Sequence, residues 1–526
     1  MSVFPTPPPV PDSIPHPASV RLPWLRETPY WLIAVAAHVV LLLLLGTVVM
    51  FEIAEEGREP MTIIRRQFDP PEYDPRDRRR LLERPEVLAE RTERTTPTVD
   101  PVQRPTTPEP RPTRQPASLR EFGTASSPAP SGFGEVGRHR TPIGGGERSE
   151  SAVTAALEWL RRHQHPDGHW SSQSFHAACA PGAGCTFAEG VQGFGADDAG
   201  FSGFDVGVTG LALLAFVGRG HTHVGSAVPR YREVVRRATV WLLAQQLRSS
   251  DASLDGLIGA PIEGLDEWIY NHAIATMALG DLLLLSRDRL RLARPVESAA
   301  RWCLRARTPG YGWKYEYQGS RSDTSVTGWM VLALKSVRAS SAGRSLRLRP
   351  EEFEEAFAGV RSWIEVATSR SNGRTGYESP GDPGSRLLRV YGEDYPFSKD
   401  LSCMTAVAIL CRIFSGESKQ SDAVRRGVAH LADHPPRWHG ATARRRSGIN
   451  LYSWYYASYA LFQVGGRTWR EWNDSMQEAL IDHQRVGGCS DGSWDPIGEW
   501  GIAGGRVYAT AMGALTLEVY YRAAND

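Results

Sequence analysis

A unit of two dissimilar helical segments recurs from about residue 148 onward, and this repetition limits the fold more than any other feature of the sequence. The first segment of each unit has one apolar stripe and one charged face, as in Arg232 to Arg237, so it meets water on one side. The second is apolar nearly all round, as in residues 208–215, and has to be buried on all sides. Alternation of the two types predicts an all-α fold in which an outer ring of helices covers an inner ring.

Six copies of the unit are recognisable, the fifth being the weakest. The half-exposed segments contain Trp159, Trp241, Trp302, Trp363, the stretch from Val428 to Leu431, and Leu480. The apolar segments contain Thr209, Thr276, Thr327, Thr405, the stretch from Tyr452 to Leu461, and Thr510. Six helix pairs would close one ring, so we predict an (α/α)6 toroid over residues 148–526.

The loops inside the units carry a motif of their own. It reads Gln164…Asp167-Gly168…Trp170 in the first copy and Gln484…Asp491-Gly492…Trp494 in the sixth. A glutamine near the end of the first helix can bind loop backbone through its amide, and the tryptophan ring can pack over it. We expect the motif to hold neighbouring repeats together.

Residues 30–51 predict a transmembrane helix after a short tail of residues 1–29. The run contains no charged residue, and as a helix it would span about 33 Å, enough to cross a bilayer core of about 30 Å. The alternative, a cleaved signal peptide, would have an apolar region of only about 7–15 residues. The arginines before the span and those soon after it nearly balance, and we expect the larger C-terminal part to lie outside the cytoplasm.

Residues 52–147 predict a disordered linker. Of the 37 prolines in the chain, 24 precede residue 148, and the linker has few large apolar side chains. Such a segment cannot bury enough surface to offset the entropy lost on ordering. The layout resembles that of bacterial proteins with a membrane anchor and a proline-rich linker, which place the linker in the periplasm. We therefore expect an inner-membrane protein whose linker gives the helical domain reach.

Charge and cysteine spacing exclude several classes of function. The chain has 60 basic and 59 acidic residues, which argues against a nucleic-acid partner. The six cysteines form no CxxC pair, so we predict neither a zinc ribbon nor any other metal site or cofactor. Cys179 and Cys185 share a loop and would be able to form a disulfide in an oxidising compartment.

The loop motif and the Thr-Gly-Leu-Ala-Leu-Leu-Ala helix of residues 209–215 resemble the prenyltransferase and squalene-cyclase repeat superfamily. The resemblance covers about residues 150–522 and implies the α/α toroid of that superfamily. Its triterpene cyclases protonate an alkene or epoxide with an Asp-x-Asp-Asp motif, which this sequence lacks. Its protein prenyltransferases hold zinc with an Asp-x-Cys pair and a later histidine, whereas Asp400 and Cys403 have a different spacing and His439 lies in a loop-like stretch.

Three residues near the predicted starts of apolar helices are candidate catalytic groups. Asp205, Asp323 and His272 would point toward a central cavity if the ring closes as predicted. A carboxylic acid in an aromatic cavity can have a raised pKa and act as a proton donor. The alternative is that Asp323, and Asp400 likewise, are helix N-caps and that His272 is a buried packing residue.

Aromatic residues provide candidates for the lining of such a cavity. Tyr452, Tyr455, Trp313, Trp329 and Tyr508 would surround a polyprenyl or hopanoid-like lipid and stabilise cationic intermediates. The alternative is that they form packing core between helices.

Two functions follow from these features. The first is a membrane-tethered scaffold that binds a polysaccharide, a lipid or a protein partner without classical cyclase activity. The second is an isoprenoid- or triterpene-modifying enzyme that uses an inner-ring aspartate as acid. A third, glycan cleavage by paired carboxylates, has no assignable pair in the sequence.

Overall fold

The computed structural model describes residues 146–179, 184–186, 199–262, 266–341, 346–383, 402–438, 449–498 and 500–519. Over these ranges the chain forms twelve α-helices and three short 3₁₀ segments, and no strand is present among them. The predicted all-α class is confirmed for this part of the chain. The predicted span of residues 30–51, nearly all of the 52–147 linker, and Asp400 and His439 lie outside the described residues.

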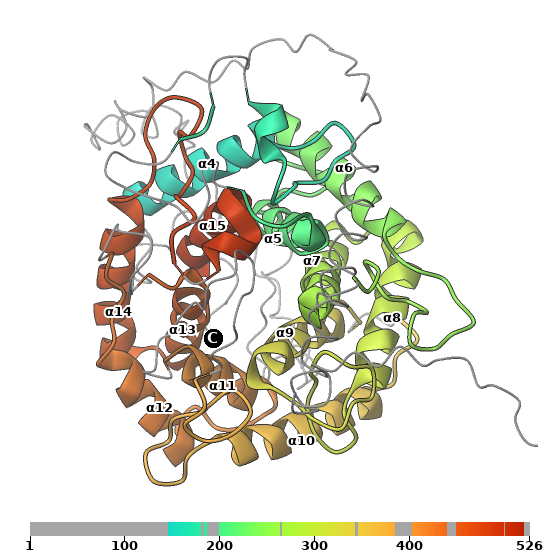
Figure 1. The fold of residues 1–526 in the computed structure, drawn as a ribbon, viewed down its shortest axis with the longest axis vertical. Coiled ribbons are helices and arrows are strands. Elements are labelled where there is room, and N and C mark those ends of the chain that lie inside the picture. Colours follow the sequence, from blue (N-terminus) through green and yellow to red (C-terminus); the bar gives the residue numbers. More distant parts are fainter. Residues whose placement is uncertain are drawn as a thin grey trace, which may run out of the picture. The chain divides into compact units, whose positions relative to one another are not determined.

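The helices alternate along the chain between an outer and an inner set (Figure 1). The outer helices are α4 (Glu147–Arg162), α6 (Pro229–Ala244), α8 (Arg289–Ala306), α10 (Pro350–Ala367), α12 (Asp422–Ala432) and α14 (Gly466–Ile481). The inner helices are α5 (Asp205–Gly218), α7 (Ile269–Ser286), α9 (Thr324–Ser341), α11 (Ser402–Phe414), α13 (Leu451–Val464) and α15 (Gly501–Leu517). The 3₁₀ segments Phe175–Ala178, Ser202–Phe204 and Asp266–Trp268 lie in loops.

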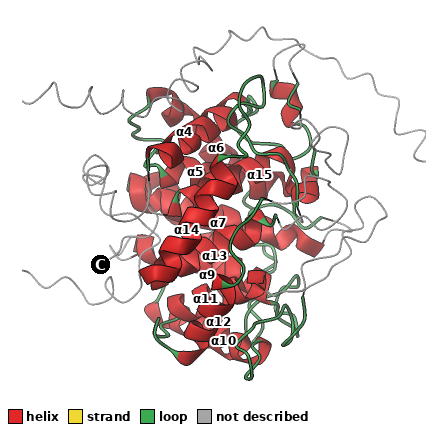
Figure 2. Ribbon diagram, turned by 90° about the vertical axis from the view of Figure 1, so that its left-hand side faces the viewer, coloured by secondary structure: helices red, strands yellow, loops and turns green. Residues whose placement is uncertain are grey.

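The inner helices contact one another in cyclic order. Each packs against the next inner helix along the chain, and α15 packs against α5, so the last inner helix meets the first. Each outer helix packs against the inner helix that precedes it, with α4 against α15, and α14 also contacts α4. In Figure 2 the described segments between these helices are loops.

Burial separates the two sets as the sequence pattern predicts. On the inner helices, Thr209, Thr327 and Thr510 are fully buried and Thr405 is 1% exposed. On the outer helix α14, Trp472, Met476 and Leu480 lie about one turn apart and are buried, while the opposite face is charged. Because the inner helices have no face left for water, they can exist only inside the outer set.

Helix α7 is long and apolar enough to cross a membrane by length and composition. Its mean hydropathy reaches 1.2 over 18 residues, but 78% of that window is buried inside the domain. Its apolarity is accounted for by its place in the inner set, where neighbouring helices cover it.

The glutamine of the loop motif joins neighbouring repeats, as expected. Gln484 donates its amide to the carbonyl of Gly492 in its own loop at 2.7 Å and to the carbonyl of Ala152 on α4 at 2.8 Å. This single side chain therefore connects the last loop of the domain to its first helix. The same two bonds recur for Gln164 with Gly168 and Val234, and for Gln246 with Gly256 and Pro295.

In the first, third and sixth units, a tryptophan and a threonine join the loop to both helices of the unit. The indole of Trp494 donates to the carbonyl of Leu480 at the end of α14 at 2.8 Å, and its backbone N–H donates to Thr510 on α15 at 3.3 Å. One residue thus connects the outer and inner helices of its own unit. Equivalent bonds join Trp170 to Leu160 and Thr209, and Trp313 to Cys303 and Thr327.

The glycine of the motif is required by geometry. Gly492 has φ +91°, a conformation that other residues rarely adopt, and a Cβ there would lie 2.1 Å from the carbonyl oxygen of Ala155. Gly168 repeats both features against Arg237. The loop can therefore approach the neighbouring outer helix only where the side chain is absent.

We expect Gln484→Ala to lower the free energy of unfolding by about 1–3 kcal/mol, because it leaves two buried carbonyls without their amide donor. Urea unfolding followed by tryptophan fluorescence measures the change. Gln420→Ala, at an exposed glutamine, is the matched control. Equal stability of the two variants would contradict the role given to the motif.

Candidate functional site

His272 lies on α7 with both ring nitrogens facing groups of the protein. Its Nδ1 accepts a hydrogen bond from the backbone N–H of Ile258 at 2.9 Å, and its Nε2 lies 3.2 Å from the carbonyl oxygen of Ala299. The ring is fully buried and packs against Trp302 with 4.4 Å between centroids. Burial lowers the pKa of His272 to about 3. These contacts are those of the packing alternative, in which a neutral His272 ties α7 to α8.

Asp323 begins α9 as a helix cap. Its carboxylate accepts the backbone N–H of Val326 at 2.7 Å, and its own N–H donates to the carbonyl of Trp313 at 2.8 Å. The residue is fully buried. The N-cap interpretation weighed from the sequence accounts for this geometry.

The predicted aromatic lining residues separate into two groups. Trp329 stacks on Tyr452 and on Tyr455, with centroids 6.0 Å apart in each pair, and all three are buried. Trp313 instead donates its indole N–H to Cys303 between α8 and α9, as the motif requires. Tyr508 is half-buried on α15 against the core. The first three rings pack against one another as helix-packing core does.

Hydroxyl groups from three inner helices meet beside this aromatic group. Tyr270 on α7 donates to Ser325 on α9 at 3.0 Å, and the Ser325 hydroxyl lies 2.8 Å from that of Tyr452 on α13. Burial, and next the charge of Asp323, raise the pKa of Tyr270. The hydroxyls therefore remain protonated at neutral pH and join the starts of three inner helices by hydrogen bonds.

Asp205 is the most accessible of the three predicted residues, with a side chain 18% exposed. Its carboxylate accepts the backbone N–H and the hydroxyl of Ser172, each at 2.8 Å. Burial raises the pKa of Asp205 against the opposing effect of the Ser172 bonds. Asp205, Asp323 and His272 are thus each held by a different set of neighbours.

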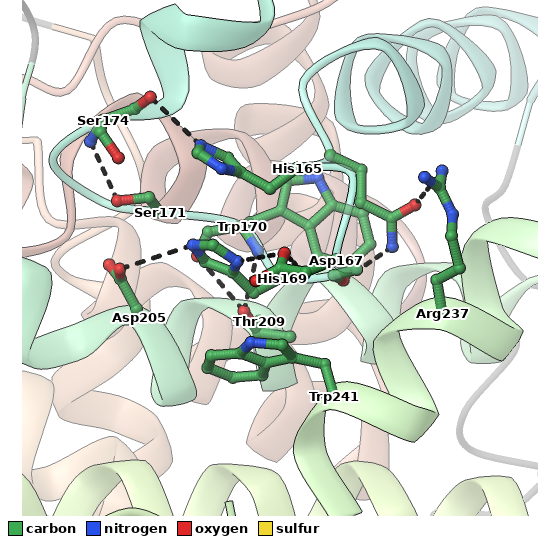
Figure 3. Close-up of polar contacts among 12 residues, drawn as sticks. His165, Asp167, His169, Trp170, Ser171, Ser174, Asp205, Thr209, Arg237 and Trp241 are labelled. Carbon is green, nitrogen blue, oxygen red and sulfur yellow. Dashed lines mark hydrogen bonds and ion pairs between the residues drawn. The ribbon is translucent and has the colours of Figure 1, made fainter. Parts of the chain in front are cut away.

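A second carboxylate and two imidazoles gather near Asp205 (Figure 3). His169 Nδ1 lies 2.6 Å from Asp167 Oδ1, and His169 Nε2 lies 3.9 Å from Asp205 Oδ2. The ring of His165 is 4.4 Å from that of His169, and Trp241 on α6 stacks on His169 at 5.0 Å. We call His165, Asp167, His169, Asp205 and Trp241 the first-loop group.

The sequence carried a signal for the first-loop group that the sequence reasoning missed. Histidines flank Asp167-Gly168 in the first copy of the motif, whereas Ser493 stands at the place of His169 in the sixth copy. The motif needs only the glutamine, the glycine and the tryptophan to join repeats. The contact between repeats does not account for the extra imidazoles.

Two clusters of metal-ligating side chains occur in the described part of the chain. One consists of His165, Asp167 and His169, and the other of His163, Cys179, Cys185 and Cys489. In each, one possible ligand atom per residue lies within 4.8 Å of all the others. Sequence reasoning assigned no metal site, because the three cysteines of the second cluster form no short-spaced pair.

The sulfur atoms of Cys179 and Cys185 are 3.8 Å apart. A disulfide bond would bring them to about 2.05 Å. The two cysteines are therefore adjacent but unbonded in this structure.

No known protein family matches the chain, and no curated protein matches it. Among solved structures it is similar to the type II terpene cyclase MstE from Scytonema, with TM-score 0.42 and 11% identity over 70% of this chain and 98% of that one. It is also similar to a possible member of the GH105 family from Klebsiella pneumoniae subsp. pneumoniae MGH 78578, with TM-score 0.41 and 13% identity over 71% and 93% of the two chains. At these TM-scores neither likeness assigns a function.

We expect Asp205→Asn to stabilise the protein at about pH 7 and to lose this advantage toward about pH 4. The folded-state pKa of Asp205 is raised. Ionisation of this carboxyl therefore lowers the stability of the fold once the pH exceeds the pKa that the group has in the unfolded chain. Asparagine keeps an acceptor for Ser172 and carries no charge. Urea unfolding at the two pH values measures the difference.

Asp167→Asn provides a comparison of opposite sign. Burial alone would raise the pKa of Asp167, but its hydrogen bonds with His169 outweigh that effect and lower it. This substitution should therefore cost stability at neutral pH and become neutral in acid. A gain for Asp205→Asn that is the same at both pH values would contradict the assignment of a strained, buried charge.

Proposed function

We propose that the chain is a membrane-tethered (α/α)6-toroid protein of the squalene-cyclase and prenyltransferase type, and that it acts as a binding scaffold. In this proposal residues 30–51 hold it in the cytoplasmic membrane. Residues 52–147 give the helical domain reach on the extracytoplasmic side. The first-loop group binds a ligand or partner there.

The first-loop group is the observation that carries the proposal. Two imidazoles, two carboxylates and an indole meet where His169 and Asp205 are each less than one-fifth exposed and Asp167 is 56% exposed. Partly desolvated polar groups beside an aromatic ring are typical of small binding sites. Carboxylates accept hydrogen bonds and imidazoles either donate or accept them, so the group suits a ligand rich in hydroxyls, whether on a polysaccharide, a lipid headgroup or a protein.

The contacts of Asp323 and His272 support binding over cyclase chemistry. The carboxylate of Asp323 caps α9, and both ring nitrogens of His272 face the backbone of a neighbouring loop and helix. Trp329, Tyr452 and Tyr455 stack on one another. These contacts support a packing role for the five side chains.

One observation favours the enzyme alternative, an isoprenoid-modifying activity. Burial raises the pKa of Asp205, which keeps more of its carboxyl protonated than an exposed aspartate would have. His169 lies beside it, oriented by Asp167 through its other ring nitrogen. An oriented imidazole next to a carboxylic acid is an arrangement suited to proton transfer.

Native mass spectrometry of the full chain, extracted from its membrane in a mild detergent, tests the binding proposal. We expect a ligand or partner to remain bound, and its occupancy to fall severalfold in His169→Ala and in Trp241→Ala. Trp438→Ala is the matched control, because Trp438 is likewise half-buried and stacks on a histidine, His483, at 4.8 Å.

Two results would contradict the binding proposal. One is the absence of any bound species, and the other is an occupancy unchanged in both first-loop variants. Formation of a product from squalene or a polyprenyl diphosphate, lost in Asp205→Asn, would instead establish the enzyme alternative. Gas chromatography of the extracted lipids detects such a product.

Membrane attachment has a test of its own. Deletion of residues 30–51 should move the protein from the carbonate-washed membrane fraction to the supernatant, because the long apolar helix in the described part of the chain, α7, is mostly buried inside the domain. A matched deletion of residues 100–121, of equal length within the linker, should leave the protein in the membrane. Retention of the first variant in the washed membrane would overturn the proposed anchor.

A further inference from the structure

Four metal-ligating side chains from three separate parts of the chain meet at one point between the first and the last loops. His163 follows the end of α4, and Cys179 and Cys185 lie in the loop between α4 and α5. Cys489 lies in the loop between α14 and α15, 326 residues after His163. His163 is fully buried, Cys185 is 8% exposed, and the other two are half-buried.

Four of the six distances among the ligand atoms are close to the edges of a tetrahedron around one ion, and all six are within 4.8 Å. His163 Nε2 lies 3.6 Å from Cys179 Sγ, 3.3 Å from Cys185 Sγ and 3.4 Å from Cys489 Sγ. The sulfur atoms of Cys179 and Cys185 are 3.8 Å apart. Tetrahedral zinc with bonds of about 2.3 Å to sulfur and about 2.0–2.1 Å to nitrogen requires edges of about 3.8 Å between sulfurs and about 3.5–3.6 Å from sulfur to nitrogen.

The imidazole of His163 is oriented for this role. Its Nδ1 lies 2.9 Å from the carbonyl oxygen of Trp159, which accepts a hydrogen bond from that nitrogen and leaves the Nε2 lone pair facing the three sulfurs. The ring stacks on Trp159 with 4.1 Å between centroids. Histidines that bind metals characteristically donate their other N–H to a carbonyl or carboxylate in this way.

We propose that His163, Cys179, Cys185 and Cys489 bind one zinc ion that fastens the end of the helical ring to its beginning. Each thiol releases its proton to solvent as its sulfur binds the metal. Three thiolates and one neutral imidazole complete four-coordinate zinc and leave no position for a substrate. The ion is therefore structural and has no part in the binding or chemistry of the first-loop group.

The position of the site explains why a fastening is useful. The chain itself joins each repeat to the next, but the contact of the last repeat with the first has no such connection. Direct contacts already align this seam. Arg162 donates to the carbonyl of Asp491 at 2.8 Å, and Thr186 donates its backbone N–H to the hydroxyl of Ser490 at 2.8 Å. The ion adds a link across more than 300 residues, which restricts the unfolded chain as a crosslink does.

The charge around the cluster suits a zinc site of this composition. Three thiolates and Zn²⁺ leave one net negative charge. The guanidinium of Arg162, the last residue of α4, lies 3.4 Å from the carbonyl oxygen of Cys489 and supplies positive charge nearby. Thiolate and imidazole ligands in a tetrahedral arrangement select zinc over magnesium or calcium, which take oxygen ligands.

Metal analysis of the wild-type full chain, purified without added metal, is the first test. Inductively coupled plasma mass spectrometry should find about one zinc per chain, and X-ray absorption at the zinc edge should fit three sulfurs and one nitrogen. Zinc content should fall severalfold in Cys489→Ser and in Cys185→Ser. It should be unchanged in Cys403→Ser, the matched control at a half-buried cysteine of α11 outside the cluster.

The wild-type measurements decide the proposal even if the cluster variants do not fold. Wild-type protein that carries no metal, that carries iron in place of zinc, or whose mass shows a disulfide among the three cysteines overturns it. A chelator that removes the zinc should lower the unfolding midpoint by about 5 °C or more, and zinc added back should restore it. An unchanged midpoint after complete zinc removal would overturn the fastening role.

Discussion

A single glutamine amide in each motif-bearing repeat, shared between its own loop and the next outer helix, is the contact on which the ring depends. In the first, second and sixth units the amide bonds a glycine carbonyl and a carbonyl of the neighbouring outer helix. Because both acceptors are backbone atoms, the contact fixes how far apart consecutive outer helices lie and how they are rotated. The glycine is obligatory, since the loop approaches its neighbour too closely for a Cβ.

The tryptophan and threonine of the motif extend this constraint inward. The indole N–H of the tryptophan donates to the outer helix, and its backbone N–H donates to the inner helix. These bonds join the loop to both helices. These buried polar contacts have directions that apolar packing lacks, and they therefore select one arrangement among many with similar burial. The inner helices bury apolar surface, and the hydrogen bonds of the loops determine how these helices are positioned.

The two polar clusters of the first loop have different relations to the ring. His163 and the three cysteines lie across the seam, where the chain provides no covalent connection, and the proposed zinc would act on stability. The first-loop group includes Asp167 of the same loop and has exposed carboxylate surface. A loop fixed by its motif gives a rigid base for such a group, which is how binding residues are commonly held on loops of a stable scaffold. Of the three candidate catalytic residues, Asp323 caps α9 and His272 contacts the backbone of a loop and of α8, whereas Asp205 belongs to the first-loop group.

The sequence by itself determined the helix types and their order. Period and polarity assigned half-exposed and buried helices, and the buried threonines at 209, 327, 405 and 510 lie where that pattern placed them. The role of Gln484 also followed from the sequence, because a motif repeated with its glycine and tryptophan implies one repeated contact. The sequence left the alternatives for Asp323 and His272 open. A structural and a catalytic role use the same residue types, and only the neighbours of the side chain distinguish them.

Only the tertiary structure brought together groups whose sequence separation carries no signal. Cys489 reaches His163 across 326 residues because the last helices pack against the first, and no spacing rule for metal ligands extends over such a distance. His169 meets Asp205 and Trp241 because a loop, an inner helix and an outer helix of two repeats converge. The local sequence pattern indicates which face of a helix is exposed to water. A site depends on which faces meet, and the packing of the helices against one another decides that.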